Sequence, residues 1–122
     1  MKSKLSRWTL VILWMLLIFY WSSIPDLKSS FPTLYDTILR KGAHISEYAV
    51  LAWLVSWAWS RVKHRWYLLA FCLTYAASDE IHQLFIRDRS GQLLDVAVDT
   101  VGILLGLWLY TKILKRQTII RR

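Results

Sequence analysis

Four apolar segments, each long enough to cross a lipid bilayer, dominate this sequence of 122 residues. A transmembrane helix needs about 20 mostly apolar residues, and such helices are expected over residues 8–23, 43–60, 66–84 and 93–111. Because 56% of the residues are hydrophobic and only 20% are charged, a water-soluble domain is excluded. The sequence therefore predicts an all-α fold, a single domain of four transmembrane helices in a compact bundle that has the lipid bilayer as its partner.

The distribution of basic residues predicts how this bundle is oriented. Eleven Lys and Arg residues lie in the N-terminal segment, the second connection and the C-terminal segment, whereas five lie on the opposite side. Cytoplasmic segments carry an excess of Lys and Arg, so both termini are expected in the cytoplasm. The net charge of +8 thus reflects orientation in a membrane, and no nucleic-acid partner is expected, because the basic residues flank apolar segments.

All eight acidic residues fall on the outer half of this topology, and several lie inside the expected spans or at their ends. A charge at mid-bilayer costs about 2.5 kcal/mol or more, so such a concentration needs compensation. The ionisable residues in or beside the spans are His44, Glu47, Asp79, Glu80, His82, Asp95 and Asp99. We predict that these residues gather in an outward-facing polar pocket.

The fourth span has the clearest polar stripe. Asp95, Asp99, Gly102 and Gly106 recur at steps of four, three and four, so the acids share one helix face with a Gly-x-x-x-Gly pair. Small residues at this spacing favour close contact between membrane helices. The contact can form within one chain or between two, so the pattern leaves both a monomer and a homodimer open.

The third span carries polar groups on two sides. Asp79, His82 and Gln83 are neighbours across one turn, whereas Glu80 is rotated by about 100° from Asp79. A helix with polar groups on two sides must be flanked by protein rather than lipid. We therefore expect the third span at the centre of the bundle, in contact with the second and fourth spans.

Three interpretations of the polar cluster stay open: a structural hydrogen-bond network, acid–base or metal-assisted catalysis, and an ion or proton pathway. The candidates for catalysis or for the polar pocket are His44, Glu47, Asp79, Glu80, His82 and Asp99. A divalent metal ion would be chelated by His and carboxylate pairs at i, i+3 spacing, although the His-Glu-x-x-His pattern is missing. The candidate metal ligands are His44, Glu47, Asp79, Glu80 and His82.

A second group of residues is placed to bind substrate at the mouth of the pocket. Its members are Lys41, Gln83, Arg87, Arg89 and Asp95. Guanidinium groups bind phosphate or carboxylate through paired hydrogen bonds, but Arg87 and Arg89 can equally pair with acids of the cluster. Lys41 either anchors an anionic group or extends to the membrane interface.

Four stretches of the sequence together resemble the VanZ family of bacterial membrane proteins, which is named for its glycopeptide (teicoplanin) resistance member. The stretches are FYWSSIPD at the end of the first span, Lys41-Gly-Ala-His44-Ile-Ser-Glu47-Tyr48, Ser78-Asp79-Glu80-Ile-His82-Gln83, and Arg89 followed by Asp95, Asp99 and Gly102. The family often has Asn at the position of Asp99, so this chain has an additional charge there.

The resemblance implies a multi-pass protein of the bacterial plasma membrane that acts on, or shields, something at the outer envelope. Combined with the polar pocket, it favours the handling of an anionic lipid or a lipid-linked envelope intermediate. The alternative is a non-enzymatic envelope binding or scaffold protein whose polar cluster holds the helices together. A shared family does not fix function, so glycopeptide resistance does not follow from the resemblance alone.

Overall fold

The computed structural model describes residues 3–25, 33–86 and 93–120, which form four α-helices and no strand. The helices are α1 (Lys4–Ser23), α2 (Thr33–Ala58), α3 (Trp66–Gln83) and α4 (Leu93–Ile120). The expected all-α fold with four helices is confirmed in the described part of the chain.

Two helices are longer than the apolar segments that predicted them. α2 begins at Thr33 rather than near residue 43, and α4 continues to Ile120 rather than ending near residue 111. The predicted boundaries followed hydrophobicity, but a helix can continue through polar residues. In the first turns of α2, an ion pair of 2.6 Å joins Asp36 to Arg40 at i, i+4 spacing, which stabilises a helix.

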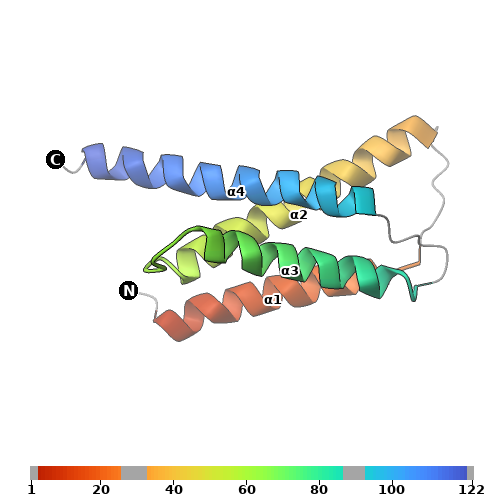
Figure 1. Ribbon diagram of the computed structural model, residues 1–122, viewed down its shortest axis with the longest axis horizontal. Coiled ribbons are helices and arrows are strands. Elements are labelled where there is room, and N and C mark those ends of the chain that lie inside the picture. Colours follow the sequence, from red (N-terminus) through yellow and green to blue (C-terminus); the bar gives the residue numbers. More distant parts are fainter. Residues whose placement is uncertain (1–2, 26–32, 87–92, 121–122) are drawn as a thin grey trace.

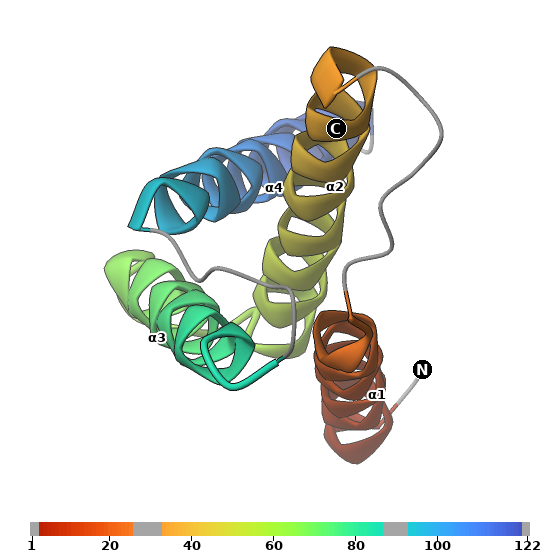
Figure 2. The same ribbon diagram turned by 90° about the vertical axis from the view of Figure 1, so that its right-hand side faces the viewer.

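The helices form a bundle in which α2 and α3 separate α1 from α4 (Figures 1 and 2). α2 and α3 each contact the three other helices, whereas α1 and α4 share no contact within the described residues. The expected contacts of α3 with α2 and α4 are confirmed. The most extensive packing, however, is between α2 and α4, so α2 shares the central position that was expected for α3.

Two glycines explain how closely α4 lies on α2. A Cβ atom added at Gly102 would overlap the backbone of Ile45, and one added at Gly106 would overlap the backbone of Ala49. The Gly-x-x-x-Gly face therefore packs within the chain. Because Ile45 follows His44 and Asp99 lies one turn before Gly102, this contact also brings the side chains of His44 and Asp99 together.

The outside of the bundle is apolar while polar side chains are buried inside it. On α1 alone, Ile12, Leu13, Leu16 and Phe19 are about half exposed. Soluble monomers rarely expose apolar patches of this extent. Two helices are long and apolar enough to cross a membrane by length and composition, over Lys4–Ser23 and Leu93–Gln117.

The two ends of the bundle differ in charge. The start of α1 and the end of α4 lie at the same end of the bundle, together with the connection between α2 and α3 (Figure 1). At that end the Arg7 guanidinium donates a hydrogen bond of 3.2 Å to the Trp57 carbonyl. Its central carbon, Cζ, lies 5.0 Å from the centre of the Trp57 ring. The opposite end contains the starts of α2 and α4 and the ends of α1 and α3. The described acidic residues in these segments are Asp36, Asp79, Glu80, Asp95 and Asp99.

Candidate functional site

The end of α3 carries two buried carboxylates in consecutive positions, and they face different neighbours. Asp79 is 4% exposed and Glu80 is 6% exposed. Consecutive residues of a helix point about 100° apart, so Asp79 turns toward α1 and α2 while Glu80 turns toward α2 and α4. The prediction that this helix offers polar groups to two sides is confirmed.

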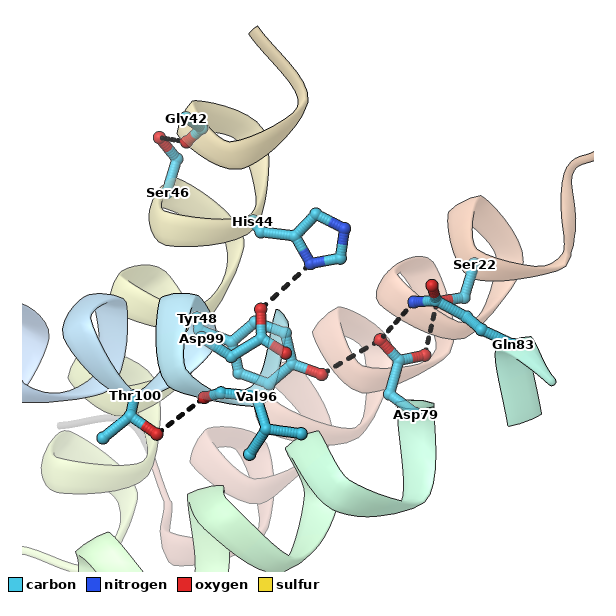
Figure 3. A network of polar contacts seen from close by, with 10 residues as sticks. All are labelled: Ser22, Gly42, His44, Ser46, Tyr48, Asp79, Gln83, Val96, Asp99 and Thr100. Atoms are coloured by element: carbon cyan, nitrogen blue, oxygen red, sulfur yellow. Dashed lines mark hydrogen bonds and ion pairs between the residues drawn. The ribbon is translucent and has the colours of Figure 1, made fainter. Parts of the chain in front are cut away.

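Asp79 is the acceptor at the centre of a complete hydrogen-bond network (Figure 3). Ser22 from the end of α1 donates to Oδ1, and Tyr48 of α2 donates to Oδ2 at 3.1 Å. Gln83, one turn further along α3, donates to Asp79 Oδ2 at 3.3 Å and to the Ser22 hydroxyl at 3.0 Å. Both carboxylate oxygens of Asp79 are therefore satisfied, and the network ties three helices together.

His82 lies on the α1 side of α3, away from the Glu80 side. Its Nε2 lies 2.9 Å from the hydroxyl of Ser23, and its ring stacks on Phe19 with 4.3 Å between ring centres. The structure therefore groups His82 with the end of α1 and leaves it out of the set of His and acidic side chains that lie within reach of one metal ion. Its predicted role in catalysis stays a prediction.

His44 and Asp99 form a pair across the α2–α4 contact (Figure 3). His44 Nδ1 lies 2.9 Å from Asp99 Oδ1, and the Asp99 side chain is fully buried. The glycine contact one turn away on α4 fixes the distance between the two helices. A carboxylate on one ring nitrogen sets the orientation of the imidazole and leaves the other nitrogen, Nε2, for a second function.

Glu80 completes a group of three side chains with His44 and Asp99. One potential ligand atom from each residue lies within 4.8 Å of the other two. Both Glu80 oxygens and Asp99 Oδ2 are buried and find no hydrogen-bond partner among the described residues. Leaving buried carboxylate oxygens unpaired is costly, so this side of α3 differs sharply from the Asp79 network.

The remaining predicted residues of the described part of the chain lie on the helices that carry this group. Glu47 lies within electrostatic range of His44, and Asp95 lies within range of Glu80 and Asp99. Lys41, one turn before His44 on α2, is half-buried. Arg87 and Arg89 lie outside the described residues.

Ser22 and Tyr48 were not among the candidate residues. Tyr48 lies one turn after His44 and on the same face of α2, and Ser22 ends the apolar first span next to Ser23. Helical spacing gives the direction of Tyr48, but only the packing of α1 and α2 against α3 reveals that both hydroxyls reach Asp79.

Comparison with known families decides the relationship that the sequence suggested. The family model described as VanZ/LLP1 matches residues 7–116. The chain belongs to the VanZ/LLP1 family. No curated protein and no solved structure shows a significant match to it.

Membership of the VanZ/LLP1 family and the two apolar helices together indicate a membrane protein. The family match extends over all four helices, from the second turn of α1 to the last turns of α4. It therefore includes the Asp79 network and the group formed by His44, Glu80 and Asp99.

Proposed function

We propose that this VanZ-family protein crosses the plasma membrane four times, with both termini in the cytoplasm and the polar site facing outward. The excess of Lys and Arg at the end that carries both termini supports this orientation. α2 and α3 are less apolar than α1 and α4 because they carry polar residues, and several of these side chains point into the bundle. An even number of crossings agrees with two termini at the same end.

This topology can be tested by cysteine accessibility. The single native cysteine, Cys72, is buried, so a Cys72→Ala background leaves introduced cysteines as the only labels. A cysteine at Lys115 in intact cells is expected to resist a membrane-impermeant maleimide, whereas one at Thr37 is expected to react. The opposite labelling pattern would reject the orientation.

The proposed function is the binding and chemical processing of an anionic lipid or a lipid-linked intermediate of the cell envelope. The observation that carries this proposal is the buried group of His44, Glu80 and Asp99, in which carboxylate oxygens have no described partner. Proteins tolerate unpaired buried charge mainly where binding or catalysis requires it. The group lies near the ends of the helices that we propose to face outward, at the level where lipid headgroups lie.

The chemistry that this arrangement supports is proton transfer. Asp99 holds the imidazole of His44 through Nδ1, so Nε2 is oriented to accept or donate a proton. Glu80, from a third helix, is the second acid–base group. Lys41, together with Arg87 and Arg89, would attract the anionic headgroup.

The proposed function is tested with the full chain in nanodiscs that contain a long-chain polyprenyl phosphate as the probe. We expect saturable binding for which a neutral polyprenol of equal length does not compete. We also expect hydrolysis of the phosphate ester by water to polyprenol and inorganic phosphate, which mass spectrometry detects. Glu80→Gln should bind the probe but lose turnover by about 100-fold, because general acid–base groups contribute 10²–10⁴-fold. Failure of the wild type to prefer the phosphate over the neutral lipid would reject the proposal.

The alternative is a non-enzymatic envelope binding or scaffold protein, and the Asp79 network favours it. Ser22, Tyr48 and Gln83 satisfy Asp79 completely, as expected of polar groups that fix helix packing. In that case the polyprenyl phosphate binds without turnover, and Glu80→Gln leaves its binding unchanged.

Resistance to teicoplanin is a separate proposal that rests on the family alone. Expression of the chain in a susceptible host should raise the inhibitory concentration of teicoplanin, and Glu80→Gln at equal membrane abundance should remove the increase. Equal susceptibility with and without the wild-type chain would reject this role.

A further inference from the structure

Three helices each contribute one potential metal ligand to the same point in the bundle. His44 comes from α2, Glu80 from α3 and Asp99 from α4, and their ligand atoms lie within 4.8 Å of one another. Two ligands of a tetrahedral Zn²⁺ ion, each about 2 Å from the metal, lie about 3.3 Å apart. The three atoms are therefore near one another but further apart than in one coordination sphere, and side-chain rotation has to bring them together.

The unpaired carboxylate oxygens give an independent reason to place a cation here. Both oxygens of Glu80 and Oδ2 of Asp99 are buried without a described hydrogen-bond partner, although the two residues are only 6% and 0% exposed. Asp79, next to Glu80 in the chain and equally buried, has partners for both its oxygens. The shortage of partners is thus specific to the Glu80 side and is not a general property of this end of the bundle.

The charges at this point are also unbalanced. Among the described residues, the side chain that lies close to both carboxylates is His44, which carries at most one positive charge. Asp79 and Asp95 add further negative charge within electrostatic range of Glu80. A divalent cation bound by two carboxylates and a neutral imidazole would form a neutral group, which is far less costly to bury than two free carboxylates.

We propose that His44, Glu80 and Asp99 bind one divalent transition-metal ion. The mixture of one imidazole and two carboxylates favours Zn²⁺ or Mn²⁺ over Mg²⁺ and Ca²⁺, which prefer oxygen ligands alone. This set of ligands differs from the set predicted from the sequence. Asp99 is added, and Glu47, Asp79 and His82 are left out because they do not belong to the group.

Three protein ligands leave at least one coordination position for a water molecule or for an oxygen atom of a bound ligand. The inference deepens the proposed function, on whose site it rests: with an ion bound, His44 and Glu80 would act as its ligands instead of as acid–base groups, and the cation would allow the acidic pocket to hold a phosphate headgroup. Without a cation, the carboxylates of Glu80 and Asp99 would repel an anionic headgroup. Metal binding can nevertheless be measured without any lipid substrate.

The test is metal analysis of the full chain in detergent, before and after treatment with a chelator, followed by titration with Zn²⁺ and Mn²⁺. The wild type should bind a single ion per chain. Glu80→Gln and His44→Ala should bind it at least about tenfold more weakly, since even residues that only support a ligand contribute 10–100-fold. Thr74→Ala, at an exposed position of the same helix, is the control and should retain the wild-type affinity.

Two results would overturn the metal proposal. One is a wild type that takes up neither ion after chelator treatment while remaining monodisperse and helical. The other is equal affinity in wild type and Glu80→Gln, which would place the ion elsewhere. A double variant, Arg87→Ala with Arg89→Ala, explains a wild type that takes up no ion. Metal binding in this variant alone would show that a guanidinium occupies the place assigned to the ion.

The outcomes also separate this proposal from the proposed function. Metal binding without preference for polyprenyl phosphate would reject the lipid substrate and retain the metal site. Binding and turnover of the lipid by a chelator-treated protein would reject the metal site and retain the function.

Discussion

The two sides of α3 each bury a carboxylate, but only one of the two carboxylates has hydrogen-bond partners among the described residues. Asp79 and Glu80 are consecutive and similarly buried, yet Asp79 receives hydrogen bonds from Ser22, Tyr48 and Gln83 while Glu80 receives none from a described residue. Complete pairing of a buried carboxylate is what helix packing requires. Incomplete pairing makes the fold less stable and is kept where a ligand or a reaction supplies the missing partner.

The comparison therefore assigns different roles to two adjacent acids. The Asp79 side holds α1, α2 and α3 together, and the Glu80 side carries the proposed activity. Variants on the Asp79 side should mainly change stability, and variants on the Glu80 side should mainly change binding and turnover.

The largest expected effect on stability is that of Asp79→Ala. This change leaves the donors of Ser22, Tyr48 and Gln83 without their acceptor and should lower the free energy of unfolding by about 3 kcal/mol. Unfolding by titration with a denaturing detergent measures this change in the free energy of unfolding. Thr74→Ala, at an exposed position of the same helix, is the control and should change stability by less than about 0.5 kcal/mol. Equal effects of the two variants on stability would show that Asp79 does not hold the helices together.

The next largest effect is expected at the contact that aligns the Glu80 side. Gly102→Ala places a methyl group against the Ile45 backbone, so α2 and α4 must separate, at a cost of about 2 kcal/mol. Because the same contact places Asp99 beside His44, metal binding should weaken too. Gly42→Ala is the matched control, since nothing lies within 4 Å of its added methyl group, and it should leave the protein as stable or slightly more stable. Unchanged unfolding and metal affinity in Gly102→Ala would contradict the close packing.

A smaller effect is expected from Tyr48→Phe, which removes one donor to Asp79 and leaves the packing of the ring in place. Hydrogen bonds between membrane helices contribute about 0.6–1 kcal/mol, so the loss of stability should be of that size. Metal affinity should stay within about twofold of the wild type, and Tyr20→Phe on the exposed surface of α1 should have no effect on stability. A strong loss of metal binding in Tyr48→Phe would show that the Asp79 and Glu80 sides of α3 act as one functional unit.

The helices and the direction of their polar faces follow from the sequence. Alternation of apolar segments with charged connections locates four helices, and helical spacing places Asp99 with Gly102 and separates Asp79 from Glu80. These features depend on residues close in the chain, so local spacing is sufficient to predict them.

The pairing of side chains across helices does not follow from the sequence. His82 lies against Ser23 and Phe19 of α1, which the sequence does not show, because the packing of α1 against α3 decides which partner lies opposite each turn. The same contact brings Ser22 to Asp79. Hydrophobicity also does not predict where α2 begins, because its first turns are an amphipathic stretch that an ion pair stabilises.

The difference between the two sides of α3 is tested most directly by the thermal unfolding of two isosteric variants, Glu80→Gln and Asp79→Asn, in the same detergent and free of metal. Glu80→Gln removes a buried charge without a partner and should unfold at the same temperature as the wild type or a higher one. Asp79→Asn replaces an acceptor oxygen that a donor faces and should unfold at a lower temperature. A Glu80→Gln protein that is less stable than Asp79→Asn would contradict the account.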